Sequence, residues 1–357
     1  MSSHFHRLRV SSVTPDTDEA TILAFDVPAD LAPAFQFIQG QHLTLRETLG
    51  GVEQRRSYSI CSGIDDSHLQ IGVRKVPGGV FSTWLNEEVK PGCEIDVMSP
   101  EGRFFVPLDA EAARHYLCIA GGSGVTPILS IMRSVLAREP RSRVTLIYGN
   151  RRQRSTMFKE ELEDLKNRYL SRLALHLVFS QEQADLPIAC GRLDRTKLGE
   201  FLGRLVDPIG IDHAFVCGPH GVNDEAEAAL LAAGVASERI HMERFGVPTS
   251  AAAARLAPMA GDAVQATIAV VRDGLTREIA FHSEHTSILD AASQAGLDLP
   301  FSCKSGVCCT CRAKLIAGKV RMERNFALDK AELAAGFVLT CQAHPLTERV
   351  MLSFDER

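Results

Sequence analysis

Four cysteines near the end of the chain have a spacing that could bind iron. Cys303, Cys308 and Cys311 form a C-x4-C-x2-C run, and Cys341 follows thirty positions later. This spacing with a distant fourth cysteine is typical of a [2Fe-2S] cluster, whose two irons are held by four thiolates. One tight loop would bring backbone N–H groups toward the sulfurs, Gly306 would permit their close approach, and Cys341 would complete the ligands of the second iron.

Zinc and unliganded thiols are the competing interpretations of these cysteines. Structural zinc sites favour paired C-x2-C knuckles, and this region has one such pair besides the adjacent Cys308 and Cys309. Four buried free cysteines are the plain structural alternative. Because Cys309 is one cysteine more than the pattern needs, we predict that it is not a ligand. Five of the ten cysteines lie in the last 55 residues, a clustering that favours metal over disulfides in a reducing compartment.

Glycine loops in two places could bind phosphate groups. Gly122-x-Gly124-x-x-Pro127 follows the apolar run 116–120 and precedes a helical pattern, so a pyrophosphate could bind at the helix N-terminus. Proline replaces the third glycine of the Rossmann pattern but suits a first helical turn, and Thr126 can cap this helix. A tight turn without a ligand is the alternative.

A second loop contains Gly78 and Gly79, with Ser82 just beyond them. It precedes a short predicted helix through Trp84 and Leu85, where exposed N–H groups could also bind a pyrophosphate.

Three arginines indicate which dinucleotide the chain prefers. Arg151, Arg152 and Arg154 follow the apolar run 144–148, and no acid accompanies them up to Ser155. In dinucleotide-binding folds an acid at this place binds the free 2′-hydroxyl of NADH, whereas arginine binds the 2′-phosphate of NADPH. The pattern therefore favours NADPH, with a solvated basic turn as the alternative.

A length of 357 residues predicts two or three domains, at roughly 150 residues each. The type of secondary structure that positions these residues changes along the chain. Up to about residue 105, short alternating strands such as 21–25, 41–45 and 69–73 are broken by glycine and proline, which indicates a small antiparallel barrel. From about residue 114, continuous apolar runs alternate with helical patterns, which indicates a parallel α/β sheet.

The last part of the chain begins with an Ala-rich stretch that has almost no large side chains, which we interpret as a linker. Alternating apolar residues from Val264 to Phe281, with a turn at Asp273-Gly274, predict a hairpin. Thr286 can cap a short helix that Gly296 ends, and the cysteine loop comes next.

Composition excludes several classes of protein. The chain is 45% hydrophobic and 23% charged, as ordinary globular proteins are, and its net charge of −5 gives no global reason to bind nucleic acid or anionic lipid. No apolar run approaches the roughly 20 residues of a membrane helix, and the first seven residues lack the apolar region of a signal peptide. We expect a soluble cytoplasmic protein.

Several of these motifs together resemble those of the ferredoxin–NADP reductase superfamily: Arg56-Ser57-Tyr58-Ser59, Gly78 to Ser82, Gly121 to Pro127, and Cys217-Gly218-Pro219. With the C-terminal cysteines added, the whole chain is similar to the oxygenase reductases. The resemblance implies a multidomain protein with an antiparallel β-barrel flavin domain over 1–107, an α/β parallel-sheet nicotinamide domain over 108–246, a linker over 247–262, and an α+β ferredoxin domain of the β-grasp type over 263–357.

The resemblance also implies roles for single residues. Arg56 would grip a flavin phosphate, Tyr58 would lie against the isoalloxazine ring, and Ser59 would lie near the flavin N5. Without the other motifs, an arginine beside a strand tyrosine is usually a solvated surface pair. Two phosphate-binding segments, Arg56 and 78–82, favour FAD over FMN.

Two further residues complete the predicted catalytic set with Ser59. In the resembled family the cysteine that matches Cys217 lies beside the nicotinamide, and an aromatic residue that matches Phe245 lies near the flavin. An inert buried thiol and an ordinary core phenylalanine are the alternatives. Gly218 and Pro219 follow the apolar run 214–217, at the edge where such sheets bind ligands.

The implied function is electron transfer from NADPH through FAD to the [2Fe-2S] cluster, because a hydride carries two electrons and the cluster accepts one at a time. The segments 5–8, 40–43 and 322–328 resemble the reductase subunits of ring-1,2-phenylacetyl-CoA epoxygenases, which implies a separate di-iron oxygenase as partner in aerobic phenylacetate degradation. The alternatives are a reductase of another aromatic or steroid hydroxylase, or an electron-relay protein that never uses nicotinamide. The three arginines and Cys217 speak against the relay.

Overall fold

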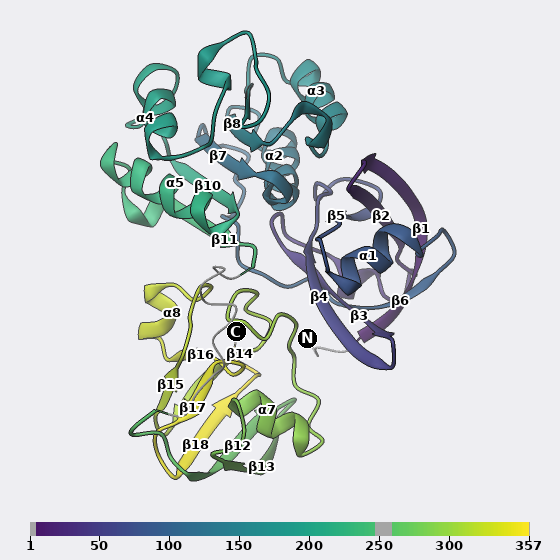
Figure 1. The fold of residues 1–357 in the computed structure, drawn as a ribbon, viewed down its shortest axis with the longest axis vertical. Helices are drawn as coiled ribbons and strands as arrows, with labels where there is room; N and C mark the ends of the chain where they lie inside the picture. Colours follow the sequence, from purple (N-terminus) through teal and green to yellow (C-terminus); the bar gives the residue numbers. More distant parts are fainter. Residues whose placement is uncertain (1–4, 247–258, 357) are drawn as a thin grey trace. The chain divides into compact units, whose positions relative to one another are not determined.

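The computed structural model describes residues 5–246 and 259–356 (Figure 1). The chain divides into two compact units, one over His4–Phe245 and the other within Gly246–Arg357. Most of the predicted linker over 247–262 lies outside the described residues. Within the described part of the chain, no helix is both long enough and apolar enough to cross a membrane.

An antiparallel sheet begins the first unit. Its strands and its helix are β1 (Phe5–Thr17), β2 (Ala20–Asp26), β3 (His42–Leu49), β4 (Val52–Ser59), β5 (Leu69–Arg74), α1 (Val80–Glu87) and β6 (Glu94–Met98). The strand order is β4-β3-β6-β1-β2-β5, and an antiparallel bridge between Ile60 and Ile71 joins the two edges. Leu23, Leu43 and Ile95 point into one fully buried core. We call these six strands and α1 the barrel, and they confirm the predicted antiparallel flavin-domain sheet.

A parallel sheet follows the barrel. Its elements are β7 (His115–Gly121), α2 (Val125–Arg138), β8 (Arg143–Asn150), α3 (Lys159–Arg168), β9 (Leu173–Phe179), α4 (Arg195–Arg204), β10 (His213–Gly218), α5 (His220–Ala232) and β11 (Ile240–Arg244). The strand order is β11-β10-β7-β8-β9, and all neighbours are parallel. These elements form the parallel-sheet domain, and they confirm the predicted α/β fold.

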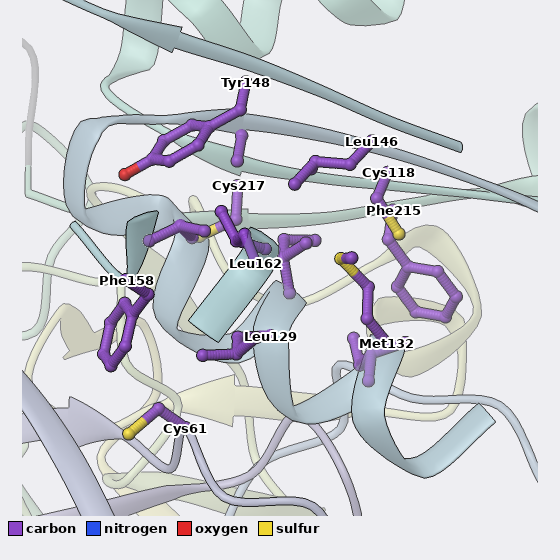
Figure 2. Packing of buried hydrophobic residues seen from close by; sticks show 14 of the residues in the cluster. Cys61, Cys118, Leu129, Met132, Leu146, Tyr148, Phe158, Leu162, Phe215 and Cys217 are labelled. Carbon is purple, nitrogen blue, oxygen red and sulfur yellow. The ribbon is translucent and has the colours of Figure 1, made fainter. Parts of the chain in front are cut away.

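Both faces of the parallel sheet are covered, which explains the continuous apolar run in β7. Cys118 lies in the core that contains α2, as Figure 2 shows with Leu129 and Met132 nearby. Leu117 lies in a second core on the other face, with residues of α4 and α5. Since every strand runs in the same direction, the loops that follow β7, β8 and β10 lie at one edge of the sheet.

The barrel and the parallel-sheet domain are joined at Asp16 and Phe158. The Phe158 N–H donates a hydrogen bond to Asp16 Oδ1 at 2.9 Å, and Phe158 has a left-handed backbone with φ 56°. Its buried ring lies against Gly72 of β5, where a Cβ atom would come within 2.6 Å of Phe158 Cζ. Burial raises the pKa of Asp16 to about 6, and the nearby Glu161 adds to the rise.

The described residues of the second unit form a mixed sheet with two short helices. Its elements are β12 (Gln265–Arg272), β13 (Leu275–His282), α7 (Ile288–Gln294), β14 (Arg312–Ala317), β15 (Val320–Met322), α8 (Lys330–Ala334), β16 (Phe337–Leu339), β17 (Ala343–Pro345) and β18 (Arg349–Ser353). The order β13-β12-β18-β14-β16 is accompanied by the pair β15-β17. The predicted hairpin is confirmed, with positive φ at Asp273 and Gly274 in its turn. We call this unit the cysteine domain, and its fold is the predicted α+β ferredoxin fold.

Two predicted helix caps are wrong. At α7 the cap is Ser287, whose extended backbone lets its hydroxyl accept from the Asp290 N–H at 3.1 Å, and Thr286 precedes it. At α2 the cap is Gly124, because a 3-10 turn over Gly122–Gly124 leads directly into the helix. Thr126 therefore lies inside the first turn, where its hydroxyl donates to the Ser123 carbonyl at 3.0 Å.

Candidate functional site

The four predicted cluster ligands face one another in two pairs. The thiols of Cys303 and Cys308 are close enough to interact with each other, and so are the thiols of Cys311 and Cys341. The fifth cysteine, Cys309, packs against the hydrophobic core of the cysteine domain. Two pairs of sulfurs suit a centre with two irons, because each iron takes two cysteine ligands.

The surroundings of the sulfurs fit such a cluster. The Ser305 N–H points at Cys303 Sγ at 3.4 Å, and the Gln342 amide nitrogen lies 3.5 Å from Cys341 Sγ. Gly306 has φ +79°, and its N–H also donates toward Cys341. Donors directed at sulfur stabilise thiolate ligands.

The R-S-Y-S motif occupies the end of β4. Arg56 is exposed, and one of its terminal nitrogens donates to the Arg55 carbonyl at 2.7 Å. The Tyr58 ring lies 6.2 Å from the Phe81 ring of α1, so the structure brings the motif beside the second glycine loop. The Ser57 hydroxyl is hydrogen-bonded to Thr44 on β3 at 3.0 Å. Arg56 and Tyr58 point to the face opposite Ser57, because side chains alternate along a strand.

The second glycine loop leads into α1 without a side-chain cap. Gly78 has φ +73°, and Gly79 is the N-cap residue. The Ser82 hydroxyl accepts from the Val76 N–H at 3.1 Å and donates to the Gly79 carbonyl at 3.2 Å. Ser82 thus stabilises the loop itself, while the start of α1 fits a phosphate group.

The first glycine loop and the Cys217-Gly218-Pro219 loop are packed backbone against backbone. A Cβ atom at Gly124 would lie 2.1 Å from the Cys217 carbonyl oxygen, and one at Gly121 would lie 3.1 Å from Pro219. Gly122 has φ +53°, and its carbonyl accepts from the Tyr148 hydroxyl at 2.9 Å. Glycine is therefore required at position 124 by the neighbouring backbone of Cys217, because the φ of −62° at Gly124 is one that any residue can adopt.

Glu243 is a site residue that none of the sequence motifs predicted. Its carboxylate accepts a hydrogen bond from the Ser59 hydroxyl at 3.3 Å, and it lies opposite Cys217 on neighbouring strands. Burial raises the pKa of Glu243 to about 7, although the Ser59 hydrogen bond lowers it. Burial also raises the pKa of Cys217, and the nearby Glu243 carboxylate adds to this effect. The one sequence feature that could have indicated Glu243 was its position as an acid in the terminal strand β11, close to Phe245.

Phe245 follows β11 directly. Its N–H is hydrogen-bonded to the Gly218 carbonyl at 3.3 Å, and its half-buried side chain packs against the core that contains Cys217. The structure therefore brings Ser59, Cys217 and Phe245 into one region.

A groove and a smaller pocket adjoin the first glycine loop. The groove, of about 750 Å³, is lined by Gly121, Gly122 and Pro219 among others. The pocket, of about 210 Å³, is lined by Arg151 and by the other two arginines of the basic loop, Arg152 and Arg154. Arg74 of β5 lines both cavities, as Arg151 does, although it belongs to none of the predicted motifs.

Comparison with known families covers most of the chain in three segments. Residues 7–106 match the oxidoreductase FAD-binding domain, residues 118–227 match the oxidoreductase NAD-binding domain, and residues 270–346 match the 2Fe-2S iron-sulfur cluster binding domain. The chain is 43% identical to a subunit of the 1,2-phenylacetyl-CoA epoxidase of Escherichia coli strain K12, over 99% of this chain and 98% of that protein. The chain belongs to the oxygenase reductases of the ferredoxin–NADP reductase type. This oxygenase reductase transfers electrons from NAD(P)H through FAD and a [2Fe-2S] cluster.

Other relatives of the oxygenase reductase support the same family. It is 35% identical to the ferredoxin reductase component of 3-ketosteroid-9-alpha-monooxygenase from Mycobacterium tuberculosis, over 100% of this chain and 98% of that one. Its fold is similar to that of phthalate dioxygenase reductase, with a TM-score of 0.60, 24% identity and 98% of both chains covered. These relatives are reductase components of oxygenases that consist of several proteins. An oxygenase component is therefore the implied electron acceptor.

Proposed function

We propose that this oxygenase reductase is the reductase component of a phenylacetyl-CoA epoxygenase in aerobic phenylacetate degradation, and that it passes electrons from NADPH to a separate di-iron oxygenase. The observation that carries the proposal is the 43% identity, over nearly the whole chain, to the epoxidase protein of Escherichia coli. Bound FAD would accept the two electrons of a hydride and release them singly to a one-electron acceptor.

Residues of the barrel would hold FAD. The exposed Arg56 guanidinium can bind a phosphate in a bidentate manner, and the Tyr58 ring on the same face can support the flavin ring. The open N-terminus of α1, after Gly78 and Gly79, can hold a second phosphate. The Ser57 hydroxyl contributes by bracing β4 against β3.

Residues of both domains would surround the place of hydride transfer. Ser59 comes from the barrel, and Cys217 and Glu243 come from adjacent strands of the parallel-sheet domain. With a pKa of about 7, Glu243 exists in both protonation states near neutral pH and can exchange a proton with the Ser59 hydroxyl. Cys217 stays a neutral thiol because burial raises its pKa, and Phe245 closes the same region.

The groove would hold the nicotinamide nucleotide. Its pyrophosphate would bind at Gly122 and Gly124 and at the first turn of α2, which contains Thr126 and Pro127. Gly218 and Pro219 border the nicotinamide end, since they follow β10 at the same edge of the sheet. The 2′-phosphate of NADPH would bind in the pocket lined by Arg151, Arg152 and Arg154.

Cys303, Cys308, Cys311 and Cys341 would hold the [2Fe-2S] cluster, from which electrons leave for the oxygenase.

An electron-relay protein that receives electrons from another protein is the second candidate. Anaerobic mixing of the isolated holoprotein with NADPH distinguishes the two, since loss of flavin absorbance without a partner excludes the relay, and unchanged absorbance excludes NADPH as donor.

Turnover with purified oxygenase components tests the partner. The reductase is combined with NADPH and either a phenylacetyl-CoA oxygenase component and phenylacetyl-CoA, or a 3-ketosteroid oxygenase component and its steroid. We expect coupled NADPH oxidation and product with phenylacetyl-CoA only. Coupling with the steroid system alone would replace the proposal with the second reductase class, which the 35% identity to the Mycobacterium tuberculosis component supports.

A further inference from the structure

The pocket that contains the arginines also has an acidic wall, which comes from the barrel. Asp18 and Glu19 line it together with the basic loop, and the barrel also contributes Thr17 and Arg74. No acid follows β8 directly in the sequence. The structure supplies two acids from a segment more than one hundred residues earlier in the chain.

We propose that Asp18 and Glu19 are specificity-determining residues, which oppose the 2′-phosphate and thereby set how strongly this reductase prefers NADPH to NADH. The inference rests on the proposed placement of the 2′-phosphate among Arg151, Arg152 and Arg154. It goes beyond that placement because it assigns selectivity to the flavin-binding part of the chain.

The acids are held in place by the hairpin on which they lie. Thr17 pairs with Ala20, so Asp18 and Glu19 form the two-residue turn between β1 and β2. The Glu19 N–H donates to the Thr17 hydroxyl at 3.3 Å, and the Glu19 carbonyl accepts from the Lys75 N–H at 2.7 Å. Both side chains are exposed to solvent. Their backbone is held by the strand pairing of β1 with β2 and by the hydrogen bonds of Glu19.

Glu19 also binds Arg74. The Glu19 carboxylate forms an ion pair with Arg74 at 3.1 Å, and another nitrogen of the same guanidinium would lie 3.1 Å from a Cβ atom at Gly122. Arg74 thus lies between the acidic turn and the loop proposed to bind the pyrophosphate. A nucleotide phosphate and Glu19 compete for this one guanidinium.

The two nucleotides should respond differently to these acids. A phosphate monoester carries about −1.5 to −2 charges at pH 7, whereas the 2′-hydroxyl of NADH is neutral and can donate to a carboxylate. Asp18 and Glu19 therefore disfavour NADPH and favour NADH, against the arginines on the other wall. Selectivity is set by the balance between the two walls.

The test compares the holoenzyme with Asp18→Asn/Glu19→Gln. Steady-state kinetics with NADPH and NADH, and ferricyanide as acceptor, give the ratio of the two kcat/KM values. We expect the ratio to rise roughly 2- to 10-fold in favour of NADPH, the range for two partly exposed charge interactions. The control Asp30→Asn/Glu88→Gln removes two exposed acids of the barrel outside this pocket and should leave the ratio unchanged.

Binding of adenosine 2′,5′-bisphosphate and of 5′-AMP gives a second readout that does not depend on turnover. The acid variant should bind the bisphosphate more tightly by a similar factor, and its affinity for 5′-AMP should change less. An unchanged ratio, or an equal rise with the control variant, overturns the inference. If the wild type prefers NADH, the NADPH proposal fails, but a shift toward NADPH in the acid variant still supports the role of Asp18 and Glu19.

Discussion

The Ser59 hydroxyl of the barrel donates a hydrogen bond to the Glu243 carboxylate of the parallel-sheet domain, across 3.3 Å. The two residues lie 184 positions apart in the chain. This hydrogen bond places a titratable group with a pKa of about 7 between the segments proposed to bind flavin and nicotinamide.

Glu243→Gln should change how stability depends on pH. Because the folded-state pKa of Glu243 is raised from about 4.5 to about 7, its contribution is fully present below pH 4.5 and is lost as pH rises through 7. The cofactor-free wild type should therefore lose up to roughly 3 kcal/mol relative to Glu243→Gln between these values, an upper limit because the residue retains some exposure. Denaturant unfolding at several pH values measures this, with the exposed Glu238→Gln as control. Parallel pH profiles for wild type and Glu243→Gln would contradict the prediction.

Replacement of single cysteines should separate ligands from the extra thiol. Serine at Cys303, Cys308, Cys311 or Cys341 removes one member of a facing pair, so the visible spectrum of the cluster should be lost or altered. Cys309→Ser keeps the side-chain size and leaves both pairs intact, so spectrum and iron content should stay as in the wild type. The ligand assignment would be refuted by loss of the cluster from Cys309→Ser alone.

Removal of two pocket arginines should weaken NADPH selectively. Arg151→Ala/Arg152→Ala deletes charge-assisted contacts that contribute on the order of 1.5–3 kcal/mol each, so the KM for NADPH should rise roughly 10-fold or more. The KM for NADH should hardly change, and NADPH binding should become less sensitive to salt. Arg204→Ala, an exposed arginine at the end of α4, is the control. Equal losses with both nucleotides would mean that the arginines serve the fold or the shared pyrophosphate.

Truncation after Phe245 should uncouple the oxygenase. Since His4–Phe245 forms one compact unit, the fragment should retain flavin and reduce ferricyanide with NADPH. It should fail to support its oxygenase, because the cluster is absent. Retained coupling to the oxygenase would show that electrons leave from the flavin.

Gly124→Ala should disrupt the backbone contact between the first glycine loop and the Cys217-Gly218-Pro219 loop. Its Cβ atom would overlap the Cys217 carbonyl, which is backbone and cannot turn away, so we expect a loss of about 1–3 kcal/mol and weaker nucleotide binding. Gly203→Ala in α4, outside the groove, meets no atom within 4 Å and should be neutral or stabilising. Thermal unfolding and NADP⁺ titration measure both variants. A Gly124→Ala variant as stable as Gly203→Ala would show that the loops can separate at little cost.

Patterns local in sequence predicted the fold well. The apolar runs at 116–120, 144–148 and 214–217 are central parts of β7, β8 and β10, because burial on both faces demands continuous apolar residues. The cap of α7 was predicted wrongly because Thr286 and Ser287 are adjacent and both have a hydroxyl, and the extended backbone selects Ser287. At α2 the cap is Gly124, which has no side chain that could signal a cap in the sequence.

Residues brought in from another domain could not be found in this way. Arg74, Asp18 and Glu19 belong to the barrel, and no spacing in the chain relates them to Arg151. Glu243 was passed over because its partner, Ser59, is distant in sequence, and a lone acid in a strand has no distinguishing pattern. In both cases the site arises from the packing of two domains.

The contact between Asp16 and Phe158 bears on how such reductases could be recombined. The acid lies on β1, and the left-handed Phe158 that donates to it lies 142 positions later, with Gly72 making room for the ring. A chimera that takes the barrel from one reductase and the parallel sheet from another obtains Asp16 and Gly72 from one parent and the residue at position 158 from the other, so the interface fits only if the second parent has phenylalanine there. Compatible parents for such hybrids can therefore be chosen from their sequences, by requiring an acid, a glycine and a phenylalanine at these positions.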